Sequence, residues 1–306
     1  MDLSFTPLQD ELRDQTRGFL AANAEPTWAE LAELGWTGAA VAEEDGGAGL
    51  TFLEEGVLHE EAGRALLHAP LWSTPTLLPL LPAEDQAAVA AGDTSWALAL
   101  GPLVPDLDSA TNVAVVGGDT IWQLDGAERE ILATSDESRP LGVLSGGEAG
   151  RALCSSDVLP SLRTRSLAIL ALEAVGVAAR ALELSVAYVA DREQFGRRIG
   201  SYQAVSHRCA QMLLETENAR SAVYGAAWAA DAEPESLPLA ASMAKAYASD
   251  AGWRVPDASI QIHGGIGFTW EHDLHFFLKR GRANAALYGD ARWHRERVAK
   301  AIFAAA

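Results

Sequence analysis

One long apolar stretch with helical spacing limits what this chain can fold into. Apolar residues recur three and four positions apart at Leu167, Leu170, Ala171, Ala174, Val177, Ala178, Ala181 and Leu184. This spacing puts them on one face of a single helix. The stripe is wide and rich in alanine, so neighbouring helices can approach closely, as in a bundle. Glu173 lies within it, and its apolar surroundings predict a buried, structural carboxylate.

The first 92 residues also carry helical signals. Thr6-Pro7 places a capping hydroxyl before a proline at the first helical position, and Thr51 with Glu54 makes a capping box before an apolar run. The glycine-rich segment 43–49 between them cannot continue a helix. We therefore predict an N-terminal helical domain over residues 1–92.

In the middle of the chain, the sequence pattern changes from that of helices to that of short strands. Residues 113–116 lead through Gly117-Gly118-Asp119 into 120–124, which is a hairpin signal, and residues 141–144 form another short strand candidate. A few short strands make a small sheet that must pack against helices. We predict a reduced β-domain over residues 93–157.

Residues 158–306 are predicted to be helical again. A helix is expected over roughly 240–262, after a loop that contains Pro234 and Pro238, and a last one over 292–304. The fold class is therefore mainly α with a small β-domain, ending in a C-terminal four-helix bundle.

Charge and motif spacing exclude several classes of protein. The net charge of −19 repels nucleic acids and anionic membranes, and the N-terminus shows no signal pattern, so a cytoplasmic protein is expected. The longest apolar stretch carries charges and is too short to span a bilayer comfortably. The two cysteines show no metal or redox spacing, and His263, His272 and His275 lack cysteine partners, so no metal site is expected.

Two segments in the last third resemble signature stretches of the acyl-CoA dehydrogenase superfamily. Residues 191–205 read DREQFGRRIGSYQAV, and residues 261–271 read QIHGGIGFTWE. Their order and separation match the family, and Leu34-Gly35-Trp36 before segment 43–49 fits its first helical domain. The resemblance implies the acyl-CoA dehydrogenase fold, an oligomer, and FAD as the cofactor.

The resemblance also implies which residues face the cofactor. In the family, the arginine and phenylalanine that match Arg192 and Phe195 face the adenine-diphosphate half of FAD across a subunit interface. A guanidinium suits a diphosphate, and glycines let backbone approach a ligand closely. The candidate cofactor-binding residues are Arg192, Phe195, Gln203, Gln261, Gly264 and Gly265.

The residues alone also allow purely structural roles for these candidates. Arg192 could cap a helix or pair with Asp191 or Glu193, and Gly264-Gly265 could be an ordinary helix-ending turn. Trp270 is expected in the core.

The family reaction takes a proton from the carbon α to a thioester and a hydride from the β carbon. A carboxylate accepts the proton and the flavin accepts the hydride. Most relatives carry this glutamate in a stretch that matches Leu287-Tyr288-Gly289-Asp290, where glycine now holds the place of the base. Asp290, one residue late, is the remaining candidate. Some relatives place the base near the position of Ser166 instead. The middle region also lacks the family's strand motifs for the flavin ring.

These losses resemble the shortened subunit of heteromeric α2β2 bacterial acyl-CoA dehydrogenases, which act in fatty acid or steroid catabolism. The resemblance implies a second, full-length subunit that supplies the glutamate, an acyl-CoA substrate, and an electron-transfer flavoprotein as a possible acceptor. Two alternatives stay open. One is a self-sufficient homo-oligomeric dehydrogenase that uses Asp290 or another carboxylate, and the other is a structural subunit without flavin.

Overall fold

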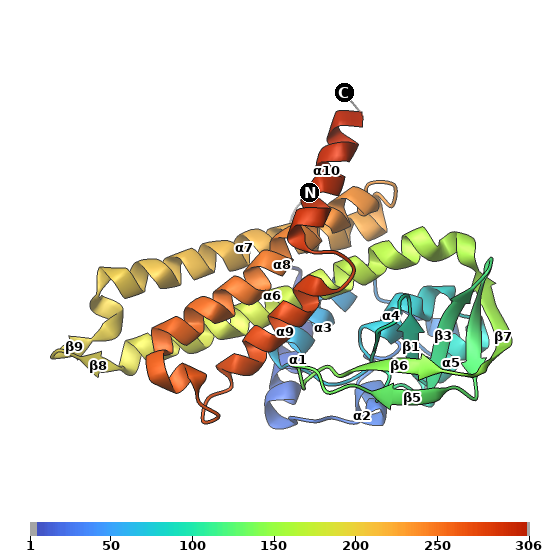
Figure 1. The fold of residues 1–306 in the computed structure, drawn as a ribbon, viewed down its shortest axis with the longest axis horizontal. Helices are drawn as coiled ribbons and strands as arrows, with labels where there is room; N and C mark the ends of the chain where they lie inside the picture. Colours follow the sequence, from blue (N-terminus) through green and yellow to red (C-terminus); the bar gives the residue numbers. More distant parts are fainter. Residues whose placement is uncertain (1–4, 305–306) are drawn as a thin grey trace.

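The computed structural model describes residues 5–304, which run from helices through strands to helices again (Figure 1). Thr6 and Thr51 cap the first and third α-helices, as predicted, and the capping box predicted at Thr51 is complete. Thr6 also forms a capping box with Gln9, which was not predicted. The N-terminal helices are α1 (Pro7–Ala22), α2 (Trp28–Glu33), α3 (Phe52–Arg64), α4 (Ser73–Leu77) and α5 (Ala83–Ala90), with 3-10 turns at Glu43–Asp45 and Leu78–Leu80.

Two small sheets follow. The first has the order β1-β3-β4-β7 and the second β2-β6-β5. The predicted hairpin is confirmed, because Gly117 pairs with Thr120 and leaves Gly118-Asp119 as the turn. The strands are β1 (Trp96–Ala99), β2 (Val104–Pro105), β3 (Asn112–Gly117), β4 (Thr120–Asp125), β5 (Glu128–Ile131), β6 (Leu141–Ser145) and β7 (Glu148–Ser155).

The C-terminal part is a bundle of long helices. Its helices are α6 (Leu159–Asp191), α7 (Gln203–Ala232), α8 (Leu237–His263), α9 (Leu274–Ala286) and α10 (Ala291–Ala304). A hairpin of β8 (Glu193–Gln194) and β9 (Arg197–Arg198) joins α6 to α7. The placement of Pro238 in the preceding loop was wrong: it lies in the first turn of α8, where a proline costs no helical hydrogen bond.

The largest core cluster lies where α6 meets α3, α7 and α8, and it contains most of the predicted apolar stripe. Helix α3 crosses α6 so closely that a Cβ on Gly176 would lie 1.8 Å from the carbonyl oxygen of Glu60. The fold class, mainly helical with small sheets, is confirmed. The domain boundaries near residues 92 and 157 stay a prediction.

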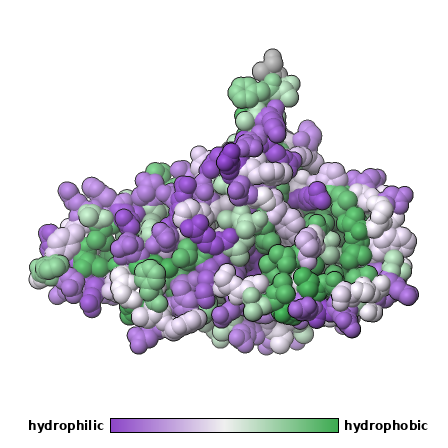
Figure 2. Space-filling model, in the orientation of Figure 1, coloured by the Kyte–Doolittle hydropathy of each residue, from purple (hydrophilic) through white to green (hydrophobic). Residues whose placement is uncertain are grey.

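The surface is mixed in polarity, and α10 extends away from the body (Figures 1 and 2). Near its end Ile302 and Phe303 are exposed, the latter by 79%. Within residues 5–304 the structure contains no helix with the length and apolarity needed to cross a membrane.

Candidate functional site

The two predicted signature segments meet at one end of the bundle. The rings of Tyr188 and His263 stack with their centroids 4.2 Å apart. Tyr188 lies one turn before Arg192, and His263 directly precedes Gly264. Helices α6 and α8 therefore end side by side, at the end that carries β8 and β9 in Figure 1. We call this end the distal surface and define it by the six candidate cofactor-binding residues together with Phe268 and Trp270.

The β8–β9 hairpin holds an aromatic ring out in water. Phe195 and Gly196 form its tip with φ angles of 53° and 77°, and Phe195 is 94% exposed. The hairpin is braced, since the Tyr202 hydroxyl donates to the Gln194 carbonyl at 3.1 Å and the Arg197 guanidinium lies 3.8 Å from the Tyr202 ring centre. A phenylalanine with positive φ is costly, and such strain concentrates at functional sites.

Arg192 follows the last residue of α6. Its backbone N–H donates to the Tyr188 carbonyl at 2.9 Å, while its side chain is exposed. Within the described part of the chain its guanidinium makes no ion pair with Asp191 or Glu193. Gln203 opens α7 and is also exposed. In a chain with a charge of −19, a guanidinium free of carboxylates suits an anionic ligand.

Gly264 and Gly265 leave their backbone uncovered. Gly264 ends α8 with φ 65° and ψ −137°. The alternative prediction, a turn that ends the helix, therefore also holds. A Cβ on either glycine would meet no atom within 4 Å. Gln261, one turn earlier, is exposed. Both roles are compatible, because a glycine that ends a helix also exposes its amides to a ligand.

The expectation that Trp270 lies in the core is wrong, because it is 74% exposed. The chain after α8 turns through the 3-10 segment Gly264–Phe268, beyond the last packed turn of the bundle. Phe268 is 77% exposed there. The sequence signal that could have found them is a run of apolar residues without helical period next to glycines. Exposed aromatic rings in one place are typical of a ligand or subunit interface.

The first turn of α10 crowds Gly289, which lies in the corner between α9 and α10. Its φ is 107°, and a Cβ would lie 2.7 Å from the Trp293 ring and 3.2 Å from His294 Nε2. The neighbouring Tyr288 stacks on Trp72, with ring centroids 5.3 Å apart. Burial raises the pKa of Tyr288 above its ordinary value. The corner is therefore packed from both sides.

Asp290 is the N-cap of α10. Its Oδ1 accepts a hydrogen bond from the Trp293 N–H at 2.8 Å, and its carbonyl accepts from the His294 N–H at 3.1 Å. The carboxylate thus satisfies a free donor of the helix. Ser166, the other position of the base in relatives, is buried in α6.

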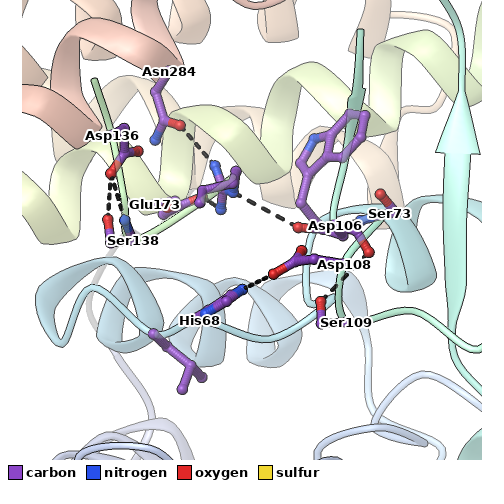
Figure 3. A network of polar contacts seen from close by, with 12 residues as sticks. His68, Ser73, Asp106, Asp108, Ser109, Asp136, Ser138, Glu173 and Asn284 are labelled. Carbon is purple, nitrogen blue, oxygen red and sulfur yellow. Dashed lines mark hydrogen bonds and ion pairs between the residues drawn. The ribbon is translucent and has the colours of Figure 1, made fainter. Parts of the chain in front are cut away.

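A buried ion network crosses the junction between the strands and the bundle (Figure 3). Glu173 on α6 is held by Arg139 and Arg280, the latter from α9. Burial alone would raise the pKa of Glu173, but these two charges outweigh it and lower the pKa to about 2. Glu173 thus has the structural role expected of it.

The network continues into the loops of the sheet. Arg280 reaches Asp136 Oδ2 at 3.1 Å and the Ser138 carbonyl at 2.6 Å, and Arg139 donates to Asn284 Oδ1 at 2.7 Å. The cavity beside it, between Glu173 and His59, measures about 10 Å³, which is room for one water. A three-ring flavin does not fit there.

A larger groove of about 610 Å³ lies where the first turns of α6 and α8 approach α10. Its walls include Leu159, Pro160 and Leu237, with Arg163 and Arg297 at its edge. Neither arginine forms an ion pair within the described residues. Such a groove suits an apolar body with an anionic group.

The histidines of the 263–275 region pack against aromatic rings. His263 lies 4.7 Å from His272, centre to centre, and stacks on Tyr188. In residues 5–304 no group of histidine, cysteine and carboxylate side chains is arranged to hold a metal ion.

Two family models match the helical regions of the chain. Residues 165–303 match the family model "Acyl-CoA dehydrogenase, C-terminal domain", and residues 6–79 match "Acyl-CoA dehydrogenase, N-terminal domain". The chain is 36% identical to acyl-CoA dehydrogenase IpdE2 of Mycobacterium tuberculosis, covering 86% of this chain and 82% of that protein. It is also 36% identical to acyl-CoA dehydrogenase FadE34 of the same organism, covering 93% of this chain but only 44% of FadE34.

Solved structures share the fold over nearly the full length. A variant of the Tcur3481-Tcur3483 steroid acyl-CoA dehydrogenase superposes with a TM-score of 0.86 at 26% identity, covering 97% of this chain and 99% of that one. The ChsE4-ChsE5 complex from Mycobacterium tuberculosis gives 0.87 at 21% identity, with 99% of both chains covered.

Fold and sequence together define a mainly helical scaffold with small β-sheets and helical N-terminal and C-terminal domains. The chain belongs to the acyl-CoA dehydrogenase family, whose members depend on FAD.

Proposed function

We propose that this chain is one subunit of an FAD-dependent acyl-CoA dehydrogenase that introduces an α,β double bond into an acyl-CoA thioester. It contributes the distal surface to the FAD site, and a second acyl-CoA dehydrogenase subunit supplies the catalytic glutamate. The observation that carries the proposal is a contrast within one chain. Position 289, which matches the base of relatives, holds a glycine crowded by Trp293, whereas the distal surface is open and keeps its charged and aromatic residues.

The distal residues fit the adenine-diphosphate half of FAD. Arg192 offers a guanidinium free of ion pairs, and the uncovered backbone at Gly264 and Gly265 permits close approach of a phosphate or ribose. Phe195 and Gln261 add an exposed ring and an exposed amide. The flavin ring, when bound, accepts the hydride. In this proposal the ring and the reacting thioester lie in the pocket of the partner subunit, which carries the glutamate.

The relatives support a two-subunit assembly. Tcur3481-Tcur3483 and ChsE4-ChsE5 are each named for two components, and the former is described as a steroid acyl-CoA dehydrogenase. Exposed Phe195, Phe268 and Trp270 give this chain an apolar surface for a second subunit. The substrate is then a fatty or steroid side-chain acyl-CoA, and an electron-transfer flavoprotein is the proposed acceptor.

A second candidate is a self-sufficient homo-oligomer with Asp290 as base. The groove beside Arg163 and Arg297 favours it, because an acyl-CoA is an apolar body with anionic groups. Its weakness is that Asp290 already caps α10.

The deciding experiment is the flavin content of the chain purified alone and together with a full-length partner. The expected ratio is little FAD alone and about one FAD per pair of subunits in the complex. Arg192→Gln in the complex is expected to reduce flavin retention, while Arg292→Gln, at an exposed site on α10, leaves it unchanged. One FAD per chain with turnover by the lone chain would sink the proposal.

A further inference from the structure

Helix α10 continues beyond the part of the body that supports it. Ala291 and His294, in its first turn, are buried, whereas every residue from 295 to 304 is exposed or half-buried. Figure 1 shows this part of the helix projecting from the body, and its tip is apolar in Figure 2. A helical segment of this length gains little stability from its own hydrogen bonds in water. Packing against a second surface is therefore expected.

The projecting part keeps the apolar face that the body buries at its base. On the face of Ala291 and His294, Val298 and Ile302 follow at spacings of four residues. Val298 is half-buried, and Ile302 is 56% exposed. We call these two residues the α10 stripe. Because it continues a face that is buried in the first turn, the stripe has the pattern of a contact surface.

The charge of α10 is opposite to that of the rest of the chain. The helix carries Arg292, Arg295, Arg297 and Lys300 against one carboxylate, Glu296, so its net charge is +3. The whole chain has a charge of −19, so the residues outside α10 carry −22. An anionic membrane would attract the helix but repel this body, whereas a second copy of the chain attracts α10 with its own negative charge.

The body offers a matching surface on α8. Leu239, Met243 and Tyr247 recur every four residues on one face of this helix and are 37%, 46% and 54% exposed. We call these three residues the α8 seam. Glu233 and Glu235, just before α8, are exposed, and neither forms an ion pair within the described part of the chain. The α8 seam thus combines apolar side chains with uncompensated negative charge, which suits a basic amphipathic helix.

The α8 seam and α10 adjoin in the same chain. Asp250 continues the face of the seam three residues after Tyr247, and it is paired with Arg295 at the base of the projecting part. The face from Leu239 to Asp250 is about 16 Å long, and residues 295–304 span about 14 Å. Identical chains related by a two-fold axis need one patch that contains both halves of the contact. This patch contains both.

We propose that two copies of this chain pair reciprocally, with the α10 stripe of each copy lying on the α8 seam of the other. The pairing buries the exposed apolar side chains of both surfaces and brings basic side chains of α10 toward Glu233 and Glu235. It does not rest on the proposed function. The seam lies in the first half of α8 and the distal surface at its end, so the two surfaces are available at the same time.

The test is the mass of the full chain in solution, measured by sedimentation velocity from about 1 to 100 µM. We expect a dimer that weakens with added salt, because opposite charges meet in the contact. Ile302→Ser and Met243→Ser should each raise the dissociation constant of the dimer at least tenfold. Phe303→Ser is the matched control and should change it less than threefold. It removes a ring that is 79% exposed near the same tip, about 100° around the helix from Ile302.

A mixture of the two weakened variants tests whether the contact is reciprocal. Ile302→Ser keeps the α8 seam intact, and Met243→Ser keeps the α10 stripe intact. A mixed pair therefore retains one complete contact, which a pair of either variant alone lacks. We expect the mixture to pair more tightly than each variant by itself. A mixture that pairs no better overturns the reciprocal arrangement.

Other outcomes also decide against the pairing. A wild type that stays monomeric at the highest concentration overturns it, as does a dimer that both variants leave intact or that Phe303→Ser weakens equally. If the lone chain does not stay in solution, the variants are made in the two-subunit complex. Each should then halve the mass of a four-chain assembly without loss of flavin, and an unchanged mass refutes the proposal.

Discussion

The indole of Trp293 lies 2.7 Å from the point that a Cβ on Gly289 would occupy. Gly289 precedes α10 and Trp293 lies in its first turn, so a side chain at position 289 would press on the start of this helix. A side chain at position 289 would therefore have to displace the Trp293 ring.

Replacing Gly289 tests this packing. We expect Gly289→Ala to destabilise the fold by about 1–3 kcal/mol, because the new methyl meets Trp293 and the positive φ strains any side chain. Urea unfolding measures the change. Gly225→Ala in α7 is the matched control: its Cβ meets nothing, and we expect no loss or a gain of up to about 1 kcal/mol. Gly289→Glu should likewise fail to restore turnover to the lone chain.

Glu173 should carry a large share of stability at neutral pH. We expect Glu173→Gln to cost about 3–5 kcal/mol, since it leaves Arg139 and Arg280 buried with reduced compensation. The exposed control Glu137→Gln, 3.9 Å from Lys279, should cost no more than about 1 kcal/mol. Equal losses in the two variants would contradict a central role for Glu173.

The same carboxylate predicts a pH dependence. Its pKa is about 2 in the folded chain and 4.5 ordinarily, so the unfolded chain binds more protons in between. Its contribution is complete above pH 4.5 and is lost as the pH falls toward 2. Between pH 4.5 and 2, the free energy of unfolding should fall more steeply with decreasing pH in the wild type than in Glu173→Gln.

Phe195 separates function from stability. We expect Phe195→Gly to leave stability unchanged or raise it by up to about 1 kcal/mol, because it removes a strained side chain that is 94% exposed. Flavin retention by the complex should fall at the same time. Phe303→Gly removes an exposed ring elsewhere, on α10, and should leave flavin retention intact. If flavin retention falls in both variants, the loss is caused by removal of an exposed ring in general and not by removal of the Phe195 ring.

Asp290 distinguishes a cap from a base. Asparagine is as good a cap, so Asp290→Asn should retain stability within a few tenths of a kcal/mol, whereas Asp290→Ala should lose about 1 kcal/mol. Turnover by the two-subunit complex should not change in Asp290→Asn. Near-complete loss of turnover in this variant would favour the self-sufficient dehydrogenase.

Features set by neighbouring residues could be predicted from the sequence. The helix cap at Thr6, the capping box at Thr51 and the turn at Gly118-Asp119 are of this kind. The apolar surroundings of Glu173 also foretold its burial. Its partners could not be foretold, because Arg139 and Arg280 lie 34 and 107 positions away.

The candidate site divides in the same way. The meeting of the segments around Arg192 and Gly264 at one end of the bundle agrees with their resemblance to one site, whereas their roles stay a prediction. The exposure of Trp270 could not be predicted, because apolar character does not reveal where the bundle stops. The closure at Gly289 depends on how α10 packs its first turn, which no local pattern encodes.

The Arg280 side chain has a consequence for how the chain comes apart. One guanidinium, 1% exposed, contacts Glu173 in the bundle, Asp136 and Ser138 beside the sheet, and the carbonyl of Leu67 after α3. If the bundle, the sheet loops or the segment after α3 opens alone, the groups that it leaves buried lose part of their charge compensation. The molecule should therefore melt in a single cooperative transition, and fragments cut at the boundaries between helices and strands should not survive as independent modules.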